Sequence, residues 1–144
     1  MKKKITTFYK KFLGSLTKQG KKVAAKRILQ HSLFKASTKT KRSIYVILVE
    51  ISSLLNSWVE IKKVRLRRNV YNVPYPLTSR RQQYLKIKWI LDEVKKDKKR
   101  VKTSEKLSAQ MIDLLINEKS KILLRKNYVQ RDVLANQSNM HYRW

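Results

Sequence analysis

The 144-residue sequence contains no cysteine, two histidines, two glycines and two prolines. Without cysteine the chain cannot form a disulfide or a thiolate metal site, and two histidines make a zinc site improbable. No apolar run approaches the roughly 20 residues that a helix needs to span a bilayer. We therefore expect neither a disulfide-stapled fold, nor a metal centre, nor a membrane span.

Acidic residues are also scarce, at nine, and they are scattered. The only adjacent pair, Asp92 and Glu93, falls in a predicted helix, where neighbouring residues do not face each other. His31 and His141 have no carboxylate close to them in the sequence. Phosphate-binding and metalloprotease motifs (GxxxxGKS/T, GxGxxG, HExxH) are absent. We predict that the chain is not an enzyme and needs no cofactor.

Positive charge dominates what is present. Lys and Arg number 36, and the formal net charge is +27. Most of these cations have no acidic partner in the chain, so self-repulsion opposes compaction unless a polyanion binds. Nucleic acid is the leading candidate, and an anionic membrane surface is the weaker one. The length fits a single domain, residues 1–144.

Apolar residues at helical spacing predict a mainly α-helical bundle of about six helices. We expect helices over 6–17, 21–34, 44–55, from 79 to the basic run at 95–100, from 104 to about 121, and from 122 into the tail. The helix over 44–55 carries one acid and almost no other charge, so it should be central and buried. The residues expected to share one face of the second helix are Val23, Ala24, Arg27, Ile28 and His31, and those of the fourth are Tyr84, Ile87, Leu91 and Val94.

Between the third and fourth helices, residues 59–75 alternate apolar and basic side chains with a period of two. This pattern predicts a two-stranded antiparallel hairpin. We place its turn at 67–69, with Asn69 in the left-handed conformation. Pro74 and Pro76 remove backbone donors, so the second strand should be an edge strand that ends there. Two strands cannot form a core alone, and we expect residues 59–76 to protrude as an arm.

Three basic segments lie outside the hairpin. The turn 18–22 places three lysines at a helix N-terminus, which suits a phosphate, although a solvated turn is an equal alternative. The run 95–100 has five cations in six residues, and we favour phosphate contact over a solvated loop. The tail 136–144 ends His-Tyr-Arg-Trp, whose rings can stack on bases, unless Trp144 packs against the body.

Three blocks carry a resemblance to a known family. VEIKKVRLRRNVYNVP, followed by SRR and KIKWI, resembles the hairpin and next helix of small-subunit ribosomal protein seven (universal protein uS seven) of bacteria and organelles. KKFLGSLTKQGKKVAAKRIL is similar to its first two helices, and residues 126–144, ending in HYRW, resemble its C-terminus. The blocks cover about half the chain in family order. The family usually has paired glycines at the hairpin tip, where this chain has Arg67 and Arg68.

The resemblance implies a helical domain with a protruding hairpin that binds the 3′ major domain of small-subunit rRNA and starts assembly of the head. Such a protein lines the tRNA exit site and the mRNA exit path beside ribosomal protein eleven. The candidate rRNA-binding residues are Lys11, Lys18, Lys21, Lys22, Lys26, Lys62, Lys63, Arg65, Arg80, Arg81, Lys96, Lys98, Lys99, Arg100, Arg125, Lys126 and Arg131. The candidates near exit-site tRNA and mRNA are Arg67, Arg68, Asn69, His141, Tyr142, Arg143 and Trp144.

We therefore expect a structural, rRNA-binding protein of the small subunit, neither membrane-bound nor homo-oligomeric. Abundant Lys, Ile and Asn, with no convincing transit peptide at the start, predict a mitochondrial member encoded in the organelle, ahead of a plastid or bacterial one. The main alternative is a DNA-binding nucleoid or helix-turn-helix protein, which normally requires a dimer surface and a recognition helix. A basic membrane-surface protein is the other, but it would concentrate its cations on one amphipathic helix.

Overall fold

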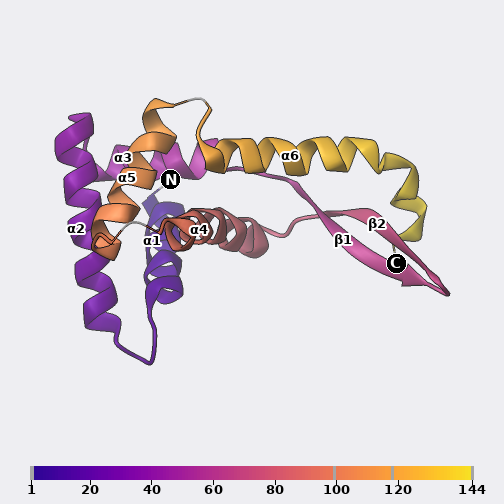
Figure 1. The fold of residues 1–144 in the computed structure, drawn as a ribbon, viewed down its shortest axis with the longest axis horizontal. Coiled ribbons are helices and arrows are strands. Elements are labelled where there is room, and N and C mark those ends of the chain that lie inside the picture. The colour runs from indigo at the N-terminus through magenta and orange to yellow at the C-terminus, as the bar shows by residue number, and fades with distance from the viewer. Residues whose placement is uncertain (1, 99, 118, 144) are drawn as a thin grey trace.

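The computed structural model describes residues 2–98, 100–117 and 119–143, and it is elongated (Figure 1). Helices gather at one end, and a two-stranded hairpin extends to the other beneath the long helix α6. The elements are α1 (Lys2–Leu16), α2 (Lys22–Thr40), α3 (Ile44–Leu54), β1 (Val59–Leu66), β2 (Asn69–Pro76), α4 (Ser79–Lys96), α5 (Thr103–Ile116), α6 (Lys121–Ala135) and the 3₁₀-helix η1 (Gln137–Tyr142). The predicted helical bundle with a protruding hairpin is confirmed.

The core lies mainly among helices α1 to α5. The middle of α3, the helix expected to be central and buried, belongs to it, whereas Ile44 and Leu54 at the ends of this helix are exposed. Ile47 and Ile51 on this helix are completely buried, as is Leu55 just after it. Ser43 caps the start of α3, because its hydroxyl accepts a hydrogen bond from the Val46 N–H. Fully burying each such aliphatic side chain contributes about 1.5–3 kcal/mol. This core fixes the helical end from which the hairpin arm projects.

Helix α2 departs from the prediction in both length and orientation. It continues to Thr40, six residues past the predicted end, and stops where Lys41 adopts a left-handed conformation with φ 53°. The predicted face was wrong, since Val23 is 68% exposed and His31 is exposed. The face that packs against the other helices consists of Ala25, Leu29, Ser32, Leu33 and Ala36. Alanine and serine carry little hydrophobic signal, yet their small size lets neighbouring helices approach.

Helix α4 is more buried than its pattern suggested. Tyr84, expected on the buried face, is exposed, whereas Lys86 and Glu93, expected off it, are buried. The Lys86 ammonium donates a hydrogen bond to the Ser52 carbonyl oxygen at 2.7 Å. The Glu93 carboxylate accepts one from the Lys96 ammonium, also at 2.7 Å. These polar residues are tolerated inside because each charged group has a hydrogen-bond partner.

The hairpin pairs Val59 with Pro76 at its base and Leu66 with Asn69 at its tip. This register leaves a two-residue turn, in which Arg67 takes the left-handed conformation with φ 54°. The expectation that Asn69 would do so was wrong, because Asn69 already belongs to β2. The second strand ends at Pro76, as predicted. At the base of the arm, the Leu77 N–H donates to the Trp58 carbonyl oxygen at 2.8 Å.

The C-terminal segment returns to the hairpin. After α6 runs above the arm, η1 turns down onto β2 (Figure 1). The Asn139 amide donates to the Asn72 carbonyl oxygen at 3.2 Å, and the rings of Tyr142 and Tyr71 lie 4.7 Å apart. The tail is therefore docked on the arm as far as Tyr142. Arg143 is exposed, and Trp144 lies outside the described residues.

Candidate nucleic-acid interface

Internal ion pairs account for few of the cations. Six ion pairs lie within the described residues, and they engage Lys35, Arg42, Lys62, Arg81, Lys96 and Arg125. The whole chain carries 36 Lys and Arg residues against nine Asp and Glu, so its acidic residues are too few to neutralise most of the positive charge. Charge of this kind is the electrostatic footprint of a nucleic-acid-binding protein.

The turn between α1 and α2 is one concentration of free charge. Gln19 and Gly20 both take left-handed conformations, with φ 50° and 72°, and they reverse the chain within a few residues. The side chains of Lys18, Lys21 and Lys22 are exposed and form no ion pair or hydrogen bond in the described part of the chain. Lys21 occupies the N-cap position of α2 without capping it through its side chain. The geometry leaves these ammonium groups available to phosphates.

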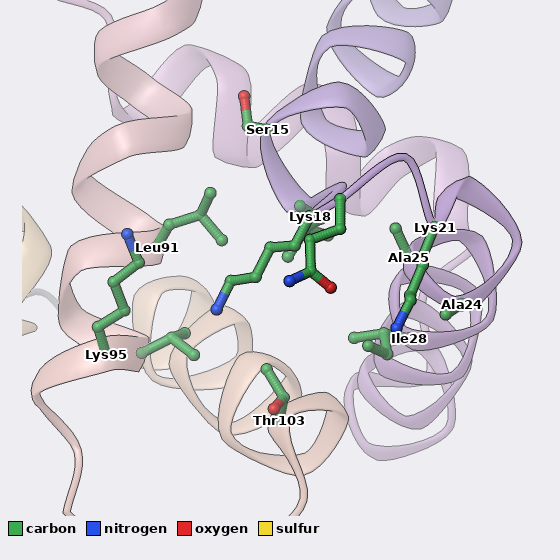
Figure 2. Close-up of a pocket in the computed structure, with 12 residues that line it drawn as sticks. Ser15, Lys18, Lys21, Ala24, Ala25, Ile28, Leu91, Lys95 and Thr103 are labelled. Carbon is green, nitrogen blue, oxygen red and sulfur yellow. The ribbon is translucent and has the colours of Figure 1, made fainter.

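A hollow of about 420 Å³ opens beside this turn, between α2 and α4. Figure 2 shows Lys18 reaching from the turn across the hollow towards α4, where Lys95 stands on the opposite side. Aliphatic side chains, among them Ile28 and Leu91, line the interior. Lys95 was missed among the candidates, although the basic run to which it belongs was recognised, because spacing along α4 does not reveal that it faces the α1–α2 turn.

The hairpin carries a second group of cations. Lys62, Lys63, Arg65, Arg67 and Arg68 are all exposed, and the last two form the tip. The Lys62 ammonium lies 4.7 Å from the centre of the Tyr75 ring and 3.9 Å from the Glu60 carboxylate. The remaining four have no ion pair within the described residues. The arm therefore presents an almost uncompensated line of charge far from the core.

Several candidate cations serve the fold itself. Arg81 donates to the Glu60 carboxylate at 3.0 Å and thereby joins the start of α4 to the hairpin. Arg125 donates to Asp92 at 3.1 Å, which ties α6 to α4, and the Lys126 ammonium donates to the Leu54 carbonyl oxygen at 2.7 Å. Lys96 pairs with Glu93. These four cations therefore already have a partner within the protein.

The other candidate rRNA-binding residues are spread over the surface. Lys11 lies half-buried on α1, while Lys26 on α2, Arg80 on α4 and Arg131 on α6 are exposed. The connection after α4 exposes Lys98 and Arg100, and Lys99 lies outside the described residues. The candidate set thus surrounds the molecule and does not converge on one pocket.

The two exit-site groups, from the middle and the end of the sequence, meet on the arm. Arg67, Arg68 and Asn69 form its tip and are exposed. Tyr142 packs on Tyr71 of β2, and the His141 ring lies 3.8 Å from the Tyr142 ring. Sequence spacing could not show this juxtaposition. The tail holds Tyr142 against the strand instead of leaving it free to stack on a base.

Within the described residues, no group of three or more histidines or carboxylates is arranged to hold a metal ion. The helices described also include none that is long and apolar enough to cross a bilayer.

Comparison with known proteins gives a consistent result across nearly the whole chain. A family model described as "Ribosomal protein S7p/S5e" matches residues 2–137. "Small ribosomal subunit protein uS7" of Bradyrhizobium diazoefficiens is 30% identical over 134 residues, which cover 93% of this chain and 85% of that protein. The protein of the same name from Pelagibacter ubique is 27% identical over 139 residues, or 96% of this chain and 88% of that protein. The chain belongs to the ribosomal protein S7p/S5e family.

Proposed function

We propose that this protein is a structural constituent of the small ribosomal subunit that binds rRNA chiefly through phosphate contacts. The observation that carries the proposal is the free positive charge on the α1–α2 turn and along the hairpin of an S7-family fold. Its relatives bear the name of a small-subunit protein. Lys and Arg that neutralise phosphates release counterions, which supplies much of the binding free energy. No feature favours a DNA-binding role, and catalysis forms no part of the proposed function.

The candidate residues divide into two roles. The cations of the helical body, including Lys18, Lys21 and Lys22, bind the 3′ major domain of the rRNA and organise the head. The hairpin tip, with Arg67 and Arg68, and the docked tail line the tRNA exit site and the mRNA exit path, next to ribosomal protein eleven. The support is geometric, because the tip and tail lie together on an arm that projects away from the body (Figure 1).

The ribosome that we propose is mitochondrial. This placement rests on the abundance of Lys, Ile and Asn in the sequence. The relatives named above are bacterial, so fractionation of the source cells is the direct check.

Co-sedimentation tests the main proposal. A tagged native chain should sediment with small-subunit particles and remain there after nuclease-free washes at moderate salt. Recovery with chromosomal DNA or with membranes, and not with the particle, would contradict it.

The division of roles is tested in the same particles. Arg67→Ala/Arg68→Ala should assemble normally, because both side chains are exposed and far from the core, yet exit-site tRNA occupancy should fall. A matched control, Lys10→Ala/Lys119→Ala, removes the same charge from exposed positions outside the candidate set. Failed assembly with normal tRNA occupancy on the surviving particles would make the tip an assembly anchor instead.

A further inference from the structure

The hollow beside the α1–α2 turn combines a cationic rim with a mainly aliphatic interior. Its rim carries three ammonium groups, those of Lys18, Lys21 and Lys95, which form no ion pair in the described part of the chain. Its interior is mainly aliphatic, with Ile28 from α2 facing Leu91 and Val94 from α4. A volume of about 420 Å³ lies within the range of small-molecule sites, about 300–1,000 Å³.

A site that bound phosphates through charge alone would need only a flat surface. An apolar interior beneath a cationic rim fits a ligand with a flat, weakly hydrated body and anionic groups at its edge. A nucleotide unstacked from an RNA strand has this chemistry, since its base can pack between apolar side chains while its flanking phosphates remain at the rim. Figure 2 shows Lys18 and Lys95 on two sides of the hollow, and Lys21 beside Ile28.

Polar groups at the edge of the hollow can read the base. Thr103 lies on its wall, and its hydroxyl has no hydrogen-bond partner in the described part of the chain. Gln19 also lines the hollow, and its amide likewise has no partner there, so it can both donate and accept. The left-handed backbone at Gln19 and Gly20 holds this amide at the rim.

We propose that this hollow is a binding site for one unstacked RNA base, with Lys18, Lys21 and Lys95 holding the phosphates on either side of it. The inference rests on the proposed rRNA-binding function and adds to it a specific subsite. The base packs flat between Ile28 and Leu91, and no aromatic ring takes part. An apolar side chain of a neighbouring protein is the competing occupant, and it would leave the hollow indifferent to RNA.

The test is methyl NMR on the full chain with labelled Ile, Leu and Val, with the oligonucleotide r(A)6 and inorganic polyphosphate of similar charge as probes. We expect r(A)6 to shift the methyl resonances of Ile28, Leu91 and Val94, while polyphosphate leaves them in place. Ile116, an exposed apolar residue elsewhere, provides the internal control. Shifts equal to those of Ile116, or equal with both probes, would overturn the proposal.

A filling variant makes the test specific. Ala24→Leu places a larger side chain into the hollow without changing the charge, and Ala109→Leu makes the same change at an exposed position on α5 that does not line it. We expect Ala24→Leu to weaken r(A)6 binding about fivefold or more, because a base could no longer bury its apolar surface there, and Ala109→Leu to have no effect. Equal affinities for both variants would refute the subsite. Salt-independent or absent binding of both probes would instead refute the rRNA-binding function itself.

Discussion

At the scale of single residues, Arg67 holds the most constrained backbone of the hairpin. Its φ of 54° places a side chain with a Cβ in a left-handed region that costs an ordinary residue about 1–2 kcal/mol. Arg67→Gly removes this cost but adds unfolded-chain entropy of about 0.5–1 kcal/mol, so hairpin stability should stay level or rise. Asn69→Gly, in the extended strand, should lower it by about 0.5–1 kcal/mol. Hydrogen exchange of the hairpin amides measures both stability changes. A larger loss of stability in Arg67→Gly than in Asn69→Gly would contradict the turn geometry.

Lys86 provides a prediction about pH. Burial, and secondly the nearby Lys126 cation, lowers the pKa of its ammonium below the ordinary value of 10.5. Between the lowered pKa and 10.5 the unfolded chain therefore binds more protons than the folded one, and the free energy of unfolding rises with pH. Lys86→Met should lack this contribution, so wild type should gain stability relative to the variant as the pH approaches 10.5. If chemical denaturation at different pH values gave a constant stability difference between the two proteins, folding would not lower the pKa of Lys86.

The sequence predicted the position of the hairpin turn but not which residue takes the left-handed conformation. Alternation up to Pro76 located the turn near 67–69, while propensity favoured Asn69 for the positive φ. The pairing of Leu66 with Asn69 decides otherwise, since a two-residue turn leaves only Arg67 and Arg68 between the strands. The burial of Lys86 was not predicted, because the spacing along α4 does not reveal that the Ser52 carbonyl oxygen lies within hydrogen-bond distance of its ammonium group.

At the scale of elements, helical periodicity found the helices but did not always choose their faces. The buried face of α3 was predicted correctly in its middle, where the apolar residues are large and charge is nearly absent. Its ends were wrong, because Ile44 and Leu54 are exposed. The face of α2 was wrong, because larger residues such as Val23 lie outside while Ala25 and Ala36 lie inside. Packing against a neighbouring helix determines which face of α2 is buried, and α2 packs most extensively against α5. The candidate hollow was equally invisible, because it requires α2, α4 and the turn to be brought together.

The tail and the hairpin should behave as one element. The contact between the Tyr142 and Tyr71 rings, together with the Asn139 hydrogen bond, holds η1 on β2. Aromatic pairs of this kind contribute about 0.5–1.5 kcal/mol beyond burial, so Tyr142→Ala should speed amide exchange around Tyr71 and Val73 several-fold. Tyr128→Ala, at an exposed position on α6, is the matched control. Unchanged exchange in Tyr142→Ala would mean that the arm does not depend on the tail.

At the scale of the whole molecule, we predict one cooperative unfolding transition for residues 1–144. The arm is not independent of the body, since Val73 in β2 is completely buried and the C-terminal η1 contacts the same strand. Thermal unfolding followed by far-UV circular dichroism and by tryptophan fluorescence should therefore give coincident midpoints. Trp89 in the core and Trp58 near the base of the arm report on different regions. Two separated midpoints would show that the chain unfolds as more than one cooperative unit.

The net charge of the whole chain follows directly from its sequence. A charge of +27 opposes compaction in the free protein, and the described structure neutralises little of it internally. RNA phosphates are therefore needed to neutralise the remaining positive charge. This requirement holds for the entire candidate surface and does not depend on any one residue in it.

The central claim is tested most directly by a salt titration of binding to a transcript of the 3′ major domain of small-subunit rRNA. If six or more phosphates are neutralised, the logarithm of the binding constant should fall against the logarithm of salt concentration with a slope of about −5 or steeper. Lys18→Gln/Lys21→Gln should make that slope less steep by about two. A wild-type slope near zero would contradict the claim that unpaired cations bind the rRNA backbone.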